Sequence, residues 1–117
     1  MSYMLLIVEP PGQRRERSEE EGRAVYDRML RFASRLKERG LLTMTQSLRS
    51  DADGARVQVR GGKRKVVDGP FTEAKEMVGG FFLLDCDSRE QAIAIAAECP
   101  AAEWATVEVR ELGPCYT

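Results

Sequence analysis

The run "MVGGFFLLDC" (Met77–Cys86) decides how the rest of this sequence is interpreted. Its apolar residues follow one another without the gaps of an amphipathic helix, so the run predicts a buried strand. Such a strand carries apolar side chains on both faces, and both faces then need a cover. The pair Gly79-Gly80 near its start indicates a β-bulge or the close approach of another part of the chain.

A helix and a strand are expected after this run. Ser88 and Gln91 form a capping-box pattern, in which each side chain accepts a hydrogen bond from a backbone N–H of the other. "TVEVREL" (Thr106–Leu112) alternates apolar and polar residues, which predicts a half-exposed strand. The helix is expected to end at Pro100, and its apolar stripe comprises Ala92, Ile95, Ala96 and Cys99.

The first forty residues predict another strand and another helix. "YMLLIVE" (Tyr3–Glu9) is a second strand with apolar residues on both faces, and residues 10–18 are interpreted as a turn and linker. Ser18 and Glu21 form a second capping box, and Gly40 ends the helix that starts there. One apolar stripe runs along this helix: Val25, Met29, Phe32 and Leu36.

A strand and a hairpin separate this helix from the central run. "LLTMTQSL" (Leu41–Leu48) predicts the strand, and "RVQVRGGKRKVV" (Arg56–Val67) predicts the hairpin. The loop Gly61-Gly62 can adopt positive φ at both positions, as a two-residue hairpin loop requires. This register pairs Val57 with Val66, so one hairpin face carries valines and the other is almost wholly polar.

The fold class expected from this order is α+β. With the hairpin treated as an insertion, the elements follow the βαββαβ order of a ferredoxin-like fold. Two helices cover one face of the sheet, and a second copy of the sheet is the simplest cover for the other, which predicts a homodimer. A chain tail or the hairpin folding over that face is the alternative.

Composition limits the function further. The chain has 117 residues, which suits one domain (1–117), and its net charge of −1 argues against general polyanion binding. No export signal or membrane span is apparent, so a cytoplasmic location is expected. Cys86, Cys99 and Cys115 are interpreted as free thiols. No metal-ligand spacing or phosphate loop is present, so no cofactor is expected.

The segment Gly54–Pro100, together with "VEVREL", closely resembles the YCII-related family and specifically its DGPF subfamily. That subfamily takes its name from the run that stands here at Asp68–Phe71, and the resemblance extends through Lys75-Glu76 to Gly79–Phe81. It covers nearly the whole chain. It implies a dimeric α+β barrel of ferredoxin-like subunits, with a cleft between the two sheets.

The resemblance also implies two kinds of function. Some YCII relatives resemble lyases or dehydrochlorinases that act through a His and Asp pair, whereas some DGPF members occur beside, or fused to, alternative sigma factors. This chain has no histidine, so the His and Asp pair is impossible, and the sequence leaves open whether it is an enzyme. Arg49 stands near the position of the relatives' histidine; it could bind an anion, but it cannot act as a general base.

Four residues are candidates for a ligand-binding site: Asp68, Arg49, Tyr3 and Phe71. Asp68 is also the candidate catalytic carboxylate. Its other interpretation is that it accepts a backbone N–H in the Asp-Gly-Pro turn, or in a short helical turn at residues 72–76. Edge packing, solvent exposure and a core anchor are the corresponding alternatives for Tyr3, Arg49 and Phe71.

Three further features have a structural interpretation beside a functional one. The basic hairpin could bind phosphate or nucleic acid, but it has no interleaved aromatic residues for base stacking, and such charge also protects exposed strands from aggregation. Cys86 follows Asp85, whose carboxylate is expected to raise the thiol pKa and make it a poor nucleophile. Trp104 is expected to pack at a strand end or an interface.

Two functions therefore remain open. In the first, the homodimer binds a small ligand in a cleft near Asp68, with a lyase or isomerase activity as an extension. In the second, the protein is a non-catalytic interaction module, such as a regulatory accessory associated with a sigma factor.

Overall fold

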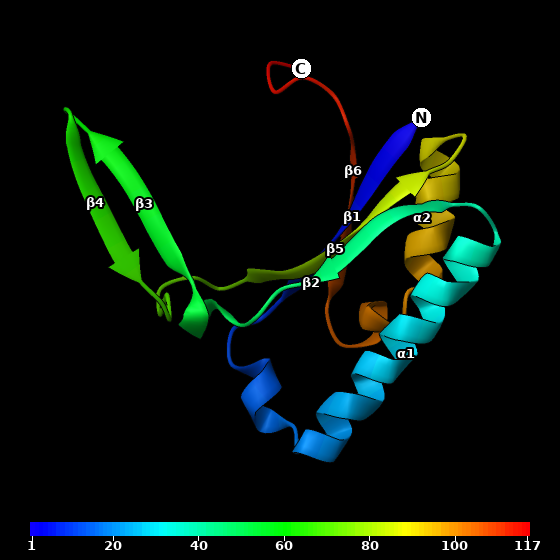
Figure 1. Cartoon of the computed structure of the whole chain (residues 1–117), viewed down its shortest axis with the longest axis horizontal. Coiled ribbons are helices and arrows are strands. Elements are labelled where there is room, and N and C mark those ends of the chain that lie inside the picture. Colours follow the sequence, from blue (N-terminus) through cyan, green and yellow to red (C-terminus); the bar gives the residue numbers. More distant parts are fainter.

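A computed structural model describes all 117 residues, and it has an α+β fold with two helices and antiparallel sheets (Figure 1). Four strands form one sheet in the order β2-β5-β1-β6, with every neighbouring pair antiparallel. This order is compatible with a ferredoxin-like fold. The elements of this part are β1 (Ser2–Glu9), α1 (Glu19–Glu38), β2 (Leu42–Ser47), β5 (Met77–Asp85), α2 (Arg89–Glu98) and β6 (Thr106–Glu111).

The hairpin forms a separate two-stranded sheet from β3 (Ala55–Arg60) and β4 (Lys63–Asp68). The expected register is confirmed, because Val57 pairs with Val66. Its loop is also as expected, with φ values of 59° and 76° at Gly61 and Gly62. Every residue of the two hairpin strands is exposed, so the hairpin stands clear of the rest of the protein.

The helices begin close to the expected residues. The capping box at Ser18 and Glu21 is confirmed, with a hydrogen bond in each direction. At the second helix Ser88 Oγ accepts the N–H of Gln91, but Gln91 Oε1 accepts the N–H of Asp87 instead of that of Ser88. The second capping box is therefore only half formed.

The hydrophobic core lies between the two helices and one face of the four-stranded sheet. Alternate residues of β1 point into it. The rings of Phe32 and Phe82 pack edge to face, with their centres 5.2 Å apart. Such contacts between α1 and β5 fasten the helix to the sheet. The largest fully buried side chains are those of Phe32, Leu5, Leu36, Leu84, Ile95 and Cys99.

The opposite face of the sheet is apolar and uncovered. Strand register places on it Met4, Leu6 and Val8 from β1, Val78, Phe81 and Leu83 from β5, and Met44 from β2. We call these seven residues the open face. Its margins are well exposed, at 43% for Val78 and 51% for Met44, so neither the hairpin nor the C-terminal segment covers it.

The structure corrects two local expectations. Residues 10–18 are not only a linker, because they contain the short 3-10 helix η1 (Gln13–Glu16). The segment after Phe71 forms no helical turn and instead closes a turn in which Ala74 N–H donates to the Phe71 carbonyl. Two further 3-10 helices are η2 (Asp51–Asp53) and η3 (Pro100–Glu103).

Candidate functional site

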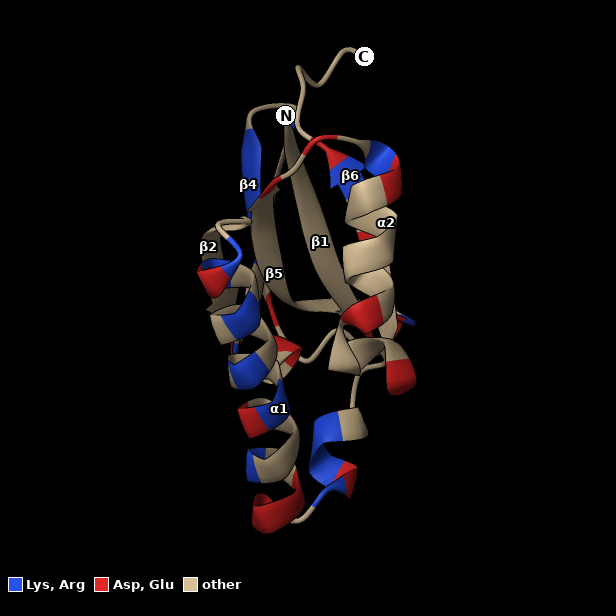
Figure 2. Ribbon diagram, turned by 90° about the vertical axis from the view of Figure 1, so that its right-hand side faces the viewer, with Lys and Arg blue, Asp and Glu red and all other residues tan.

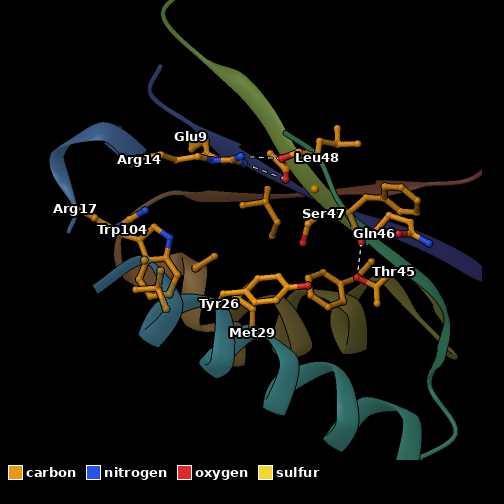
Figure 3. Close-up of a pocket in the computed structure, with 18 residues that line it drawn as sticks. Glu9, Arg14, Arg17, Tyr26, Met29, Thr45, Gln46, Ser47, Leu48 and Trp104 are labelled. Atoms are coloured by element: carbon orange, nitrogen blue, oxygen red, sulfur yellow. Dashed lines mark hydrogen bonds and ion pairs between the residues drawn. The ribbon is translucent and has the colours of Figure 1, made fainter. Parts of the chain in front are cut away.

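A cavity of about 280 Å³ lies between α1 and the helix-covered face of the sheet (Figure 3). Its walls come from α1, β1, β2 and β5, together with η1, η3 and the residues that follow these two short helices. Its volume is close to the lower end of the range for small-molecule sites. The residues labelled in the close-up are Glu9, Arg14, Arg17, Tyr26, Met29, Thr45, Gln46, Ser47, Leu48 and Trp104.

One wall of the cavity is a buried ion pair. Glu9, at the end of β1, is only 6% exposed and points to the helix side of the sheet. Arg14 Nη2 donates to Glu9 Oε1 at 2.6 Å, and Arg14 Nε donates to Oε2 at 3.2 Å. Arg14 Nη1 also donates to the Leu48 carbonyl at 2.7 Å. This bidentate pair links β1, η1 and the end of β2.

Gly79 provides the space for this ion pair. A Cβ atom at this position would lie 1.7 Å from Glu9 Oε1 and 2.7 Å from Arg14 Nη2. The strand register also shifts here, between Ile7 and Val8 of the neighbouring strand, as expected for the bulge indicated by Gly79-Gly80. The bulge and the missing side chain together let the carboxylate and the guanidinium approach the backbone of β5.

An aromatic ring with two cations forms one end of the cavity. The guanidinium of Arg17 lies 5.6 Å from the centre of the Trp104 ring, and that of Arg28 lies 5.4 Å from it. Arg28 is paired with Glu103, whereas Arg17 forms no ion pair. Only Arg17 of the two lines the cavity. Arg17 therefore brings to the cavity a positive charge that no ion pair engages, although, after the hydrogen bonds from Ser18, it contributes at longer range to lowering the pKa of Glu21.

The remaining walls combine apolar side chains with hydroxyl groups. Met29 packs against the core, as expected of the α1 stripe, and also lines the cavity. Val25, expected on the same stripe, is half-buried and lines the cavity outside the core cluster. Ser47 and Thr45 contribute hydroxyl groups from β2, and Thr45 Oγ1 is already engaged as a donor to the Phe81 carbonyl. The cavity thus has an apolar wall on α1 and polar groups on the sheet side.

The four candidates from the sequence do not gather in this cavity, and none of them lines it. Asp68 is exposed at the end of β4, and its carboxylate makes no hydrogen bond. Arg49 has a side chain that is 88% exposed and pairs with Asp53 at 3.4 Å. Tyr3 is buried in the core at 3% exposure, and burial, with a smaller contribution from Glu111, raises the pKa of its phenol.

Phe71 is not the core anchor that was considered. It is half-buried outside the core, and the guanidinium of Arg56 lies 4.1 Å from the centre of its ring. The turn that holds it is fastened by Asp51, whose Oδ2 accepts the Phe71 N–H at 3.2 Å. The hydrogen bond expected of Asp68 is therefore made by Asp51.

This assignment predicts different effects for the two aspartates. Asp51→Ala is expected to lower the free energy of unfolding by about 1 kcal/mol, as for the loss of a helix cap. Asp68→Ala is expected to change it by less than about 0.5 kcal/mol, because the exposed carboxylate makes no hydrogen bond. Urea unfolding of both variants measures the difference, and a larger loss from Asp68→Ala would contradict the assignment.

The cysteines offer no activated thiol. Burial is the main cause that raises the pKa of Cys86, and Asp87 and Asp85 add to it. The expected rise in the pKa of Cys86 is thus confirmed, although the carboxylate of Asp85 is not its largest cause. Burial also raises the pKa of Cys99. All three cysteines are free, as expected, and Cys115 is exposed.

The residues of the cavity wall were missed because their sequence signals are weak. Arg14 and Arg17 fall in a stretch interpreted as a linker, and nothing in their spacing indicates that one is paired and the other is not. Two signals were available. Glu9 is a charged residue at the end of an otherwise apolar strand, and Gly79 was recognised as a position of close approach.

No group of three or more His, Cys, Asp and Glu residues is arranged to hold a metal ion. A helix able to cross a lipid bilayer is also absent, because none is both long and apolar enough.

Comparison with protein families matches residues 1–115 to the YCII-related domain. The chain belongs to the YCII-related family. A relative in Rhizobium meliloti (strain 1021), described as "Uncharacterized protein R00369", is 31% identical over 114 residues, which cover 96% of this chain and 92% of the relative. Neither description assigns an activity to the YCII-related domain or to this relative.

Proposed function

We propose that this protein is a homodimer that binds a small organic anion in the cavity between α1 and the sheet. The observation that carries the proposal is the unpaired charge of Arg17 beside Trp104. Of the charged residues that line the cavity, Glu9 and Arg14 neutralise one another, which leaves the charge of Arg17 for a ligand.

The run at Asp68–Phe71 supports a further proposal, that the chain is a member of the DGPF subfamily.

The apolar wall defines the other half of the ligand. Val25, Met29 and Ile7 line the cavity beside the Trp104 ring, so a flat apolar body can be buried there. A guanidinium that lies over an aromatic ring, as Arg17 lies over Trp104, can still donate its N–H groups to a carboxylate or sulfonate. The proposed ligand class is therefore a small anion with an apolar or aromatic body.

A lyase or isomerase step would need a proton acceptor in the cavity. Glu9 is the carboxylate there, and both of its oxygens already accept hydrogen bonds from Arg14. Ligand binding is therefore the function that the cavity supports best. The proposed site also differs from the expected cleft near Asp68, because that residue lies on the hairpin.

The open face supports the homodimer. Its seven apolar side chains come from the central strands β1 and β5 and from the edge strand β2. The other edge strand, β6, borders them with polar residues. Exposed apolar patches of this kind mark interaction sites on otherwise ordinary surfaces. A second copy offers the same patch, so two open faces can cover one another in a symmetric interface.

Trp104 gives a direct test because it is the only tryptophan in the chain. We expect 2-naphthoate to change Trp104 fluorescence on titration and to bind more tightly than its neutral analogue 2-naphthamide. Arg17→Gln is expected to weaken naphthoate binding about 10-fold, the order of one charge-assisted hydrogen bond. Naphthamide binding is expected to stay the same, because it lacks the charge.

Arg28→Gln is the matched control. Arg28 also lies over the Trp104 ring, but it is paired with Glu103 and does not line the cavity. Naphthoate affinity should therefore remain within about 2-fold of the wild type, since a surface ion pair contributes little. Equal effects of the two substitutions, or equal affinities for naphthoate and naphthamide in the wild type, would count against an anion site at Arg17.

A further inference from the structure

The hairpin Ala55–Asp68, which we call the arm, projects from the body of the protein on the side of the sheet opposite to α1 and α2 (Figures 1 and 2). This is also the side of the open face. All twelve residues of its strands are exposed. A two-stranded ribbon without a packed face is marginal in water, so the arm needs a surface to pack against.

One face of the arm is suited to such packing. Its pairing places Val57, Val59 and Val66 on the same face, and these side chains are 61%, 59% and 45% exposed. The other face carries Gln58, Lys65 and most of the remaining charges, and its base lies beside the turn around Phe71. The valine face therefore has no partner within its own chain.

Charge is divided unequally between the arm and the body. The arm holds five of the 18 basic residues but only one of the 19 acidic residues, so it carries +4 and the rest of the chain carries −5. Figure 2 shows this contrast, with a mostly basic β4 and acidic residues at the ends of both helices. The net charges of the arm and of the rest of the chain are thus opposite in sign, which favours the approach of the arm of one copy to the body of another.

We infer that the valine face of each arm packs against the body of a second copy of this chain, next to the open face. The inference rests on the homodimer proposed above and adds a second contact to it, in which the arm of each copy packs on the other copy. A copy that packs on the open face meets the arm, because both lie on the same side of the sheet. The valines supply the apolar contact. Four of the five basic residues lie on the other face of the arm, so their charge favours the approach of the oppositely charged body rather than a direct contact at the valines.

The same features favour a protein partner over nucleic acid. The centre of the valine face is apolar, and the arm carries no aromatic residue on which a base could stack. The basic residues alone would suit phosphates, so nucleic acid is retained as an outcome of the test.

The test compares two variants that carry uncharged substitutions on opposite faces of the arm. The first variant carries Val57→Thr, Val59→Thr and Val66→Thr, which retain shape and strand propensity but place hydroxyl groups at the contact. The matched control carries Gln58→Thr and Val67→Thr on the other face. Light scattering after gel filtration measures the molar mass of each full chain over a range of concentrations.

We expect the wild type and the control to have the mass of two 13.1-kDa chains at micromolar concentration. The valine-face variant is expected to dissociate, with a dissociation constant raised roughly 100-fold by buried hydroxyl groups without partners. Its circular dichroism should match the wild type, because the substituted residues are exposed within the chain. Val59→Lys, a single change on the same face, should dissociate the dimer as well.

The outcomes separate the inference from the homodimer itself. A monomeric wild type overturns both. A dimer that persists in the valine-face variant and in Val59→Lys overturns the arm contact but leaves the homodimer in place. Dissociation of the control to the same extent overturns the assignment of the contact to the valine face. Binding of a labelled 20-nucleotide DNA, with dimers unchanged in all variants, assigns the arm to nucleic acid instead.

Discussion

Replacing Arg14 by methionine is expected to lower the free energy of unfolding by about 3 kcal/mol. Methionine retains much of the side-chain length but leaves the Glu9 carboxylate, whose side chain is 8% exposed, without its partner. Removing one partner of a buried ion pair typically costs about 3–5 kcal/mol. We expect a cost at the lower end of this range because the Arg14 side chain is 34% exposed, so water can reach part of the site.

Two further variants make this result specific. Arg23→Met removes an ion pair with Glu19 in which both side chains are about 80% exposed, and it is expected to cost less than about 1 kcal/mol. The double variant Glu9→Leu, Arg14→Met removes both charges and is expected to be more stable than Arg14→Met alone. Urea unfolding gives all three values. Equal losses for Arg14→Met and Arg23→Met would show that burial does not distinguish the two pairs.

The secondary structure could be predicted because its signals are local. A serine three residues before a glutamate marks the start of α1, and two consecutive glycines mark the loop of the arm. The apolar pattern of β1 and β5 also indicated correctly that the sheet has two apolar faces. Each of these signals lies within a few residues and depends little on the rest of the chain.

The candidate site could not be predicted in the same way, because its parts come from distant segments. Glu9, Arg14, Gly79 and Trp104 meet only after β1 pairs with β5 and η1 folds against them. The turn at Phe71 shows the same limit. The sequence indicated Asp68, which stands just before the turn. The carboxylate that accepts the Phe71 N–H instead comes from Asp51, twenty residues before Phe71.

Gly79→Ala is the second substitution with a large expected effect, a loss of about 2–4 kcal/mol. The new methyl group would overlap Glu9 Oε1, which would lie 1.7 Å away, so the carboxylate must move out of its pairing with Arg14. Forcing extra atoms into a packed site typically costs about 1–3 kcal/mol, and the disturbed ion pair adds to this. Thermal and urea unfolding measure the loss.

Gly22→Ala provides the control for a change from glycine to alanine as such. Nothing lies within 4 Å of a Cβ at Gly22, and the residue is inside α1, so alanine is expected to stabilise the protein by about 0.5–1 kcal/mol.

The cause assigned to Gly79 can be tested in a Glu9→Ala background. There the added methyl group no longer meets a carboxylate, and the next atom that it approaches is Arg14 Nη2, the end of a flexible side chain. Gly79→Ala should therefore cost at least 1 kcal/mol less than in the wild type, by roughly the coupling expected of residues in contact. Strictly additive losses would mean that glycine is required by the backbone of the bulge instead of by the ion pair.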